Sequence, residues 1–189
     1  MMFYLVMSTL ALLSSGHAMA YGGRHLSIGE CPNITEKYDF EPIQYTGRWF
    51  ELQRYPVYYE RNEDCVNAVY TDLGNGYIEV YNWARVISGG YSNITGKAHL
   101  IAPGVLLVEF EGYPAGEYHV LDTDYEQFSC VYNFVQQGEV RVQDAWILSR
   151  TMVMQENTFS HAMQVFVDNG IDISIFDATY QGDDCPYPS

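Results

Sequence analysis

Asn82 is the polar residue whose setting in this 189-residue chain most clearly suggests a binding contact. Alternate residues of the segment 77–87 form an apolar row in which Asn82 carries a polar amide. The row is Ile78, Val80, Asn82 and Ala84. A buried amide left without hydrogen-bond partners costs roughly 1–3 kcal/mol. Two interpretations stay open: an amide satisfied within the protein core, or a polar contact for a ligand in an apolar cavity.

Arg150 and Trp49 form a second candidate pair. Arg150 ends a row of alternating residues, Val142, Asp144, Trp146 and Leu148. A guanidinium in that position needs a flat partner, and the segment TGRWFEL offers the indole of Trp49. If the first and last strands of a closed barrel are neighbours, the two groups can stack, a contact worth about 0.5–2 kcal/mol. The pair would then close one end of the barrel.

The cysteines and histidines give little support to catalysis or metal binding. Cys31, Cys65, Cys130 and Cys185 form no C-x-x-C pair, so we expect no zinc site. An even count in a secreted chain suggests two disulfides, with three possible pairings, which would leave no thiol nucleophile. No Ser-His-Asp set is visible, so no catalytic residue is assigned. A haem carrier would need an inward histidine, and the pattern leaves the orientation of His119 undecided.

The N-terminal segment predicts a secreted protein. Residues 1–20 contain no charged side chain, are mostly apolar, and end in the cleavage-like Ala18-Met19-Ala20. The apolar run is shorter than the ~20 residues that a membrane span needs, which favours a signal peptide over an anchor. We expect residues 21–30 to be a flexible leader and 31–189 to be one domain. N-glycosylation sequons begin at Asn33 and Asn93 and fit an extracellular glycoprotein.

The charge excludes some partners. The formal net charge is −15, which repels phosphate backbones and anionic membranes. We therefore expect no nucleic-acid partner, and no segment after residue 20 is apolar enough to be an integral membrane span.

The remaining pattern predicts an all-β fold. Period-2 runs separated by turn residues indicate eight strands, near 48–55, 65–72, 77–87, 91–101, 105–111, 117–123, 127–134 and 142–150. Helical spacing follows in 155–169, and a short strand is expected at about 174–180. Eight strands on short turns favour an up-and-down antiparallel barrel or a sandwich, with one C-terminal helix packed outside.

Two constraints fix which residues face inward. A sequon asparagine must face solvent, so Asn93 faces out. Cys65 faces out if it attaches a flanking segment, which places Tyr70 inside. The opposite row of 77–87 is unusually aromatic, and either the helix packs on it or it is a contact in a homo-oligomer. This outer row is Tyr77, Tyr81 and Trp83.

Three motifs together resemble the conserved regions of the lipocalin family. They are Gly47-Arg48-Trp49, Thr123-Asp124-Tyr125 and Arg150 at the end of WILSR, in the same order and spacing. The resemblance covers Cys31 to the C-terminus. Within the family it is greatest to the apolipoprotein D and insect Lazarillo group, and nearly as great to insect bilin-binding proteins and the carotenoid-binding crustacyanins.

The resemblance implies a cup-shaped eight-stranded barrel, closed near Trp49 and Arg150 and open at the other end. It implies disulfides Cys31–Cys130 and Cys65–Cys185. It also implies that Tyr70, Asn82 and Trp146 line a pocket for a small hydrophobic ligand: a lipid, sterol, retinoid or pigment.

The implied function is therefore carriage of such a ligand in lipid transport or protection from oxidative stress, without a required cofactor. A bound bilin or carotenoid chromophore is an alternative, although Ala84 replaces a polar residue of bilin-binding relatives. A further alternative is a protein-interaction lipocalin without a dedicated ligand.

Overall fold

The computed structural model describes residues 25–57 and 60–188. The predicted signal peptide, the first residues of the predicted leader, and Tyr58 and Tyr59 lie outside the described residues.

The described chain forms one ten-stranded antiparallel sheet, a helix and a short 3-10 turn. The strands are β1 (His25–Ile28), β2 (Gly47–Arg54), β3 (Glu63–Gly74), β4 (Tyr77–Val86), β5 (Tyr91–Ala102), β6 (Val105–Phe110), β7 (Gly116–Thr123), β8 (Phe128–Gln137), β9 (Val140–Ser149) and β10 (Asp177–Ala178). The helix is α1 (Glu156–Asp168), and the 3-10 turn is η2 (Ile173–Ile175).

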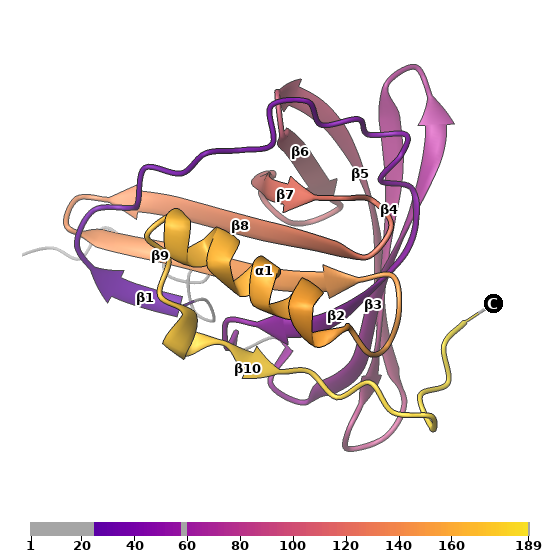
Figure 1. Cartoon of the computed structure of the whole chain (residues 1–189). Helices are drawn as coiled ribbons and strands as arrows, with labels where there is room; N and C mark the ends of the chain where they lie inside the picture. The colour runs from indigo at the N-terminus through magenta and orange to yellow at the C-terminus, as the bar shows by residue number, and fades with distance from the viewer. Residues whose placement is uncertain (1–24, 58–59, 189) are drawn as a thin grey trace, which may run out of the picture.

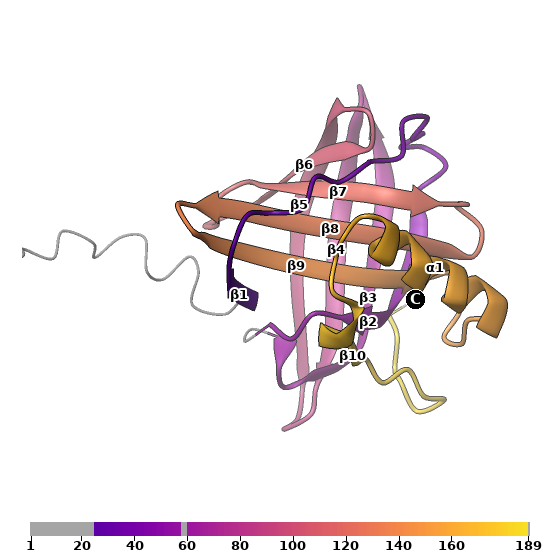
Figure 2. The ribbon, with the colours of Figure 1, turned by 60° about the vertical axis from the view of Figure 1, so that its left-hand side comes forward.

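Strands β2 to β9 close into a barrel (Figures 1 and 2). Each strand pairs with the next along the chain, and β2 pairs with β9, from Phe50 opposite Ser149 to Arg54 opposite Trp146. The predicted eight-stranded up-and-down barrel is confirmed, and so is the adjacency of its first and last strands. Short turns join most of these strands, which is why the connectivity is a simple meander.

The segment predicted to be a flexible leader includes a strand. Residues His25–Ile28 form β1, which pairs with Val140 to Gln143 of β9. Only the last residues of β9 pair with β2, so the rest of that edge would otherwise leave its backbone groups unpaired. β1 occupies this edge, and the connection from β1 to β2 then runs past β7, where the Lys37 amide donates to the Val120 carbonyl (Figure 2).

The inward faces of the strands form a core that is tightest at one end of the barrel. Trp49 and Tyr45 are fully buried there, among apolar side chains from every part of the wall. These are Phe40, Tyr70, Ile78, Val80, Ala98, Leu106, Val120, Val131 and Leu148. Other side chains of this inner cluster are only partly buried, namely Ala68, Val108, Phe110, Tyr118, Tyr125 and Trp146.

Helix α1 lies on the outer face of the barrel, as predicted, against β8 and β7 (Figure 1). Ala162 and Phe166 are fully buried on its inner side and contact a second apolar cluster between helix and sheet. That cluster includes Tyr55, Leu121, Phe128, Cys130, Tyr132, Ala145, Ile147 and Ile171.

Two members of the predicted aromatic outer row, Tyr81 and Trp83, pack against the C-terminal segment and not against the helix, whereas Tyr77 is exposed. Cys65 is bonded to Cys185, which confirms this predicted disulfide, and the bond holds the last residues against β4. The ring of Tyr187 packs edge-on to Trp83 at 6.3 Å. The interpretation that the helix packs on this row is therefore wrong, because α1 covers the β7–β8 side of the barrel.

The predicted Cys31–Cys130 disulfide is not formed, and both cysteines are free. The Cys31 amide donates to Oε1 of Gln136 at 2.8 Å, six residues further along β8 than Cys130. Six strand residues span about 20 Å, whereas a disulfide needs Cα atoms within about 7 Å. The Cys130 thiol faces the helix instead and donates to the Ala162 carbonyl at 3.4 Å.

Candidate ligand-binding site

Trp49 and Arg150 close the narrow end of the barrel, as predicted. The Arg150 guanidinium carbon lies 3.8 Å from the centre of the Trp49 ring. The indole N–H donates to the Tyr45 carbonyl at 2.9 Å. Since Trp49 is fully buried with its one polar group satisfied, it fixes the floor of the barrel.

The charge of Arg150 is directed at backbone carbonyls around this floor. Its Nε donates to Tyr125 at 2.9 Å and its Nη1 to Arg48 at 2.8 Å. Its Nη2 lies 3.3 Å and 3.4 Å from the carbonyls of Gln44 and Tyr45. Every nitrogen of the guanidinium is therefore engaged in closing the barrel and not in contacting a ligand.

Gly47 is required by this arrangement. Its φ is +96°, which side-chain-bearing residues rarely adopt, and an added Cβ would lie 3.2 Å from Nη1 of Arg150. The spacing of glycine and tryptophan in the first motif thus has a physical cause: the glycine makes room for the arginine that covers the indole.

The Thr123-Asp124-Tyr125 motif forms the turn that supports Arg150. The Asp124 carboxylate accepts hydrogen bonds from the backbone N–H groups of Glu126, Gln127 and Phe128. Burial alone would raise its pKa, but these backbone bonds outweigh that effect and lower the pKa of Asp124. The carboxylate therefore stays charged and holds the turn.

Tyr125 connects the turn to the segment before β2. Its backbone has the left-handed φ of +66°, and its N–H donates to the Thr123 hydroxyl at 2.9 Å. Its own hydroxyl accepts from the Glu41 amide at 2.9 Å. All six residues of the predicted barrel-closing motif therefore contribute to one end of the molecule.

Four hydroxyl groups form a row inside the barrel above this floor. Tyr70 contacts Tyr118 at 3.1 Å, Tyr118 contacts Tyr45 at 3.0 Å, and Tyr45 contacts Ser129 at 2.8 Å. We call this row the hydroxyl chain. Burial raises the pKa of Tyr45 and Tyr118 well above their usual range and that of Tyr70 to about 12, so all three phenols are neutral near pH 7. Of its members, the sequence had singled out Tyr70 alone.

Asn82 occupies the inward row of β4, opposite Ala68 on β3 and Ile94 on β5. It is partly exposed, and within residues 25–57 and 60–188 its side chain makes no hydrogen bond. Among these residues, the amide therefore lacks the partners that a core asparagine would have, and its hydrogen-bonding groups remain available to water or a ligand.

Trp146 and Tyr70 also face inward, but they stand at different heights. Tyr70 pairs with Gly47 near the floor, and Asn82 is close to it on the adjacent strand. Trp146 pairs with Arg54 towards the other end of β2 and is only partly buried. The structure thus brings Tyr70 and Asn82 onto neighbouring strands and places Trp146 on a separate part of the wall.

A buried charged cluster that the sequence did not indicate lies at that other end. Arg54 donates to the Glu51 carboxylate at 2.8 Å and to the backbone carbonyls of Glu60 and Glu63 at 2.6 Å and 3.2 Å. Burial raises the pKa of Glu51 even beside Arg54, and burial followed by the nearby Glu51 charge raises that of Glu60. Arg54 thereby fixes the connection between β2 and β3.

His119 faces outward. Its Nδ1 lies 3.0 Å from the Glu36 carboxylate and its Nε2 lies 3.2 Å from that of Glu117. Its ring stacks on Phe134 at 5.1 Å, on the same side of the sheet as Tyr132. It is therefore directed away from the barrel interior, and the haem hypothesis loses its candidate ligand.

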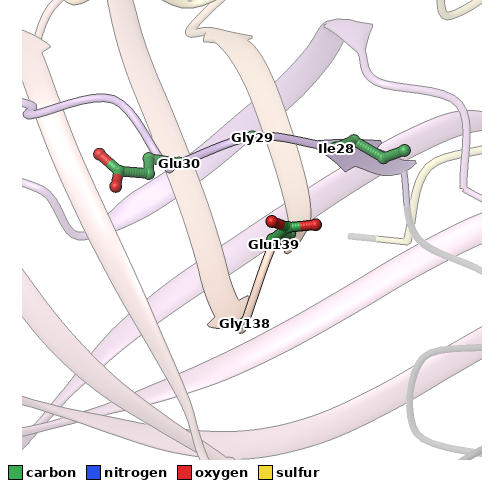
Figure 3. Close-up of a pocket in the computed structure, with 5 residues that line it drawn as sticks. All are labelled: Ile28, Gly29, Glu30, Gly138 and Glu139. Atoms are coloured by element: carbon green, nitrogen blue, oxygen red, sulfur yellow. The ribbon is translucent and has the colours of Figure 1, made fainter.

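A surface hollow of about 360 Å³ lies between the end of β1 and the β8–β9 turn (Figure 3). It is lined by Ile28, Gly29, Glu30, Gly138 and Glu139. Two carboxylates and a single apolar side chain make a poor setting for a hydrophobic ligand, so we do not place the site there.

The two predicted glycosylation sequons lie at the surface of the molecule. Asn33 and Asn93 are both exposed, so both sequons are accessible. In the part of the chain that the structure describes, no helix has the length and hydrophobicity to cross a bilayer. The same residues hold no cluster of three or more potential metal ligands.

Comparison with known proteins places the chain in a family. A family model described as a lipocalin-like domain matches residues 40–181. Apolipoprotein D of Macaca fascicularis is 32% identical over 188 residues, covering 95% of this chain and 98% of the relative. Temperature-induced lipocalin-1 of Arabidopsis thaliana is 31% identical over 175 residues, covering 81% and 89%.

Solved structures show the same fold. Insecticyanin from the tobacco hornworm Manduca sexta has a TM-score of 0.77 at 25% identity, covering 85% of this chain and 91% of that chain. Lobster apocrustacyanin A1 has a TM-score of 0.78 at 21% identity, covering 86% and 94%. The chain belongs to the lipocalin family, and its relatives include apolipoprotein D, as the motifs predicted.

Proposed function

We propose that this protein is a secreted carrier that binds one small hydrophobic molecule inside its barrel. The observation that carries the proposal is that several inward side chains of a closed barrel remain partly exposed. The floor at Trp49 and Tyr45 is fully buried, while Tyr118, Trp146 and Ala68 face inward and remain partly exposed. In a closed barrel, solvent reaches inward side chains through the interior, which is where a ligand would replace it.

The chemistry of the wall supports an apolar ligand with a few polar groups. Valine, isoleucine and leucine side chains provide the apolar surface, at about 25 cal/mol per Å² of buried area before ordering costs. Tyr70, Asn82 and Trp146 would orient the ligand. A lipid, sterol or retinoid fits this description, as does a bilin or carotenoid pigment like those suggested by the sequence resemblance.

Secretion is proposed from three features that agree. The N-terminal pattern is that of a signal peptide, both sequons are exposed, and the Cys65–Cys185 bond is of a type that persists in oxidising compartments. Transport of lipids, or their protection from oxidation, would be the physiological role.

We favour carriage over thiol-dependent catalysis although two cysteines are free. Cys130 lies between the sheet and α1, outside the inner cluster, and burial raises the pKa of its thiol well above the usual range. Burial also raises the pKa of Cys31. Neither thiol is activated as a nucleophile would need to be.

The bound ligand can be identified from protein purified from its native source. Organic extracts are analysed by mass spectrometry, with an absorption spectrum from about 300 to 750 nm. We expect one stoichiometric apolar compound. Bands in the visible range would make it a pigment. An extract without any such compound would favour the protein-interaction alternative.

Trp146→Ala is expected to weaken binding of the neutral dye Nile red about tenfold, because the indole offers a large flat surface to an apolar ligand. Asn82→Ala is expected to weaken the binding of ligands that carry a polar group. Both variants should unfold at nearly the wild-type urea concentration, since both side chains are only partly buried. Fluorescence titration measures the affinity.

Tyr38→Ala is the matched control for the loss of an aromatic side chain, because Tyr38 is 85% exposed on the segment before β2. Equal affinities of Trp146→Ala, Tyr38→Ala and the wild type would remove Trp146 from the binding site.

A further inference from the structure

We propose that the hydroxyl chain selects a ligand whose inner end carries a neutral oxygen that accepts a hydrogen bond, such as a ketone, ether or alcohol. The proposal rests on the proposed function, since it assigns the class of molecule that the barrel takes. It concerns the direction in which the ligand enters as well as its chemistry: the oxygen would lie towards the floor and the apolar body towards the open end.

The first step is a count of protons in the chain. Four hydroxyl groups carry four protons, and three contacts join them in the order Tyr70, Tyr118, Tyr45 and Ser129. Each contact uses one proton as donor, whichever way it points. One O–H therefore always remains unused, and among the described residues none of the four hydroxyls has a further partner.

The second step is where a ligand can meet the unused donor. Tyr45 and Ser129 are fully buried at one end of the chain. Tyr118 is partly exposed, and the terminal member beside it, Tyr70, is buried at 5% exposure. If the hydroxyls all donate in the direction from Ser129 to Tyr70, the free proton lies on Tyr70. A ligand oxygen placed there would complete the chain.

The third step concerns charge. The phenols are neutral near pH 7, so they can donate a proton but bring no positive charge. Arg150, whose charge acts on Tyr45 and Tyr70, is stacked on Trp49 and already bonded to four carbonyls. Arg54 is bound to Glu51 at the other end of β2. A carboxylate at the inner end would lose its hydration without forming a direct ion pair, because every nitrogen of Arg150 already donates to a carbonyl. A neutral oxygen avoids this cost.

The fourth step is the apolar surrounding of the chain. Tyr45 and Tyr70 lie in the inner cluster with Ile78, Val80 and Leu106, which offer no hydrogen bonds from their side chains. The chain is therefore an isolated polar spot on an apolar wall, and it gives a ligand one preferred orientation.

The test compares three ligands of one length on the full mature protein: tridecan-2-one, n-tridecane and tridecanoate. Each displaces Nile red in a competition titration at pH 7. In the wild type, we expect the ketone to bind about five to ten times more tightly than either the hydrocarbon or the carboxylate, as for one added hydrogen bond.

Two variants then locate the effect. Tyr70→Phe combined with Tyr118→Phe removes the two hydroxyls at the end of the chain where the proposal places the ligand oxygen, and the ketone advantage should fall to less than about twofold. Ser129→Ala removes the buried hydroxyl that can otherwise accept from Tyr45, so Tyr118 becomes the one acceptor in the chain for the Tyr45 O–H, and the free proton moves towards Tyr70. The ketone advantage should then be at least as large as in the wild type.

The matched control is Tyr55→Phe combined with Tyr132→Phe, which removes two phenol hydroxyls from the outer cluster and should leave the ketone advantage unchanged.

A ketone advantage that survives the loss of the Tyr70 and Tyr118 hydroxyls would overturn the proposal. So would equal affinities of the three ligands in the wild type, although displacement of the dye would still support a carrier. If Nile red fails to bind at all, the carrier function and this proposal both fail. If the Tyr70→Phe/Tyr118→Phe variant does not fold, the affinities of the three ligands for the wild type and for Ser129→Ala test the proposal.

Discussion

Replacing Trp49 by alanine is expected to lower the free energy of unfolding by about 3–5 kcal/mol, the range seen when a buried aromatic side chain is truncated. The indole is fully buried, packs 5.0 Å from the Tyr45 ring, and lies under the Arg150 guanidinium. Its loss would leave a cavity at the floor, remove the indole hydrogen bond to the Tyr45 carbonyl and leave an arginine without its flat partner. Urea unfolding, followed by circular dichroism, measures the change.

Two further variants separate the floor from a general effect of losing an aromatic ring. Trp49→Phe keeps a ring under Arg150 and should cost less than Trp49→Ala. Tyr38→Ala removes an exposed ring and should change the free energy of unfolding by no more than about 0.5 kcal/mol. A Trp49→Ala protein as stable as Tyr38→Ala would mean that the closed end does not depend on this stacking.

Loss of the Cys65–Cys185 disulfide is expected to lower the free energy of unfolding by about 2–5 kcal/mol. The bond joins residues 120 positions apart and holds the C-terminal segment over Trp83. Replacing both cysteines by alanine removes the cross-link without leaving a lone thiol. Thermal or urea unfolding of the double variant against the wild type measures the loss.

A reductant and a thiol count control this result. Dithiothreitol should destabilise the wild type but not the Cys65→Ala/Cys185→Ala variant. The denatured, unreduced wild type should release two thiols, from Cys31 and Cys130. A count of zero would show that these two cysteines are joined after all, and the anchoring of Cys31 beside Gln136 would then be wrong.

The barrel could be predicted from the sequence because its signals are local. Period-2 alternation and turn residues mark each strand, and the eight predicted runs agree with β2 to β9 to within a few residues. β1 was not predicted because its role is set by a distant element. Four residues with no strong pattern form a strand only because β9 has an edge that β2 leaves open.

The closed end was predicted and the hydroxyl chain was not, for a similar reason. Gly47, Trp49 and Arg150 belong to recognisable motifs, whereas the hydroxyl groups that contact one another in the chain come from residues 48 to 84 positions apart and share no motif. Tyrosines are frequent in this sequence, so their types alone did not distinguish the three that meet inside the barrel.

The number of cysteines in the sequence does not determine which of them are bonded. Four cysteines indicate two bonds, but the position of Cys130 along β8 decides whether Cys31 can reach it. The outer row is a second example. Trp83 is an aromatic side chain on the outer face that packs against another segment, and its pattern did not indicate that this segment is the one around Cys185 and not the helix.

The most direct test of a ligand-binding barrel is to block its interior. Ala68 faces inward on β3 and is only partly buried, so Ala68→Trp would fill the space above the floor while the wall stays intact. Ala115→Trp, at an exposed turn, is the matched control. Nile red is titrated into each protein, and circular dichroism confirms that each is folded. We expect saturable binding of one dye molecule to the wild type and to Ala115→Trp, and at least about tenfold weaker binding to folded Ala68→Trp. Unchanged binding to Ala68→Trp would place the ligand outside the barrel and contradict the proposed function.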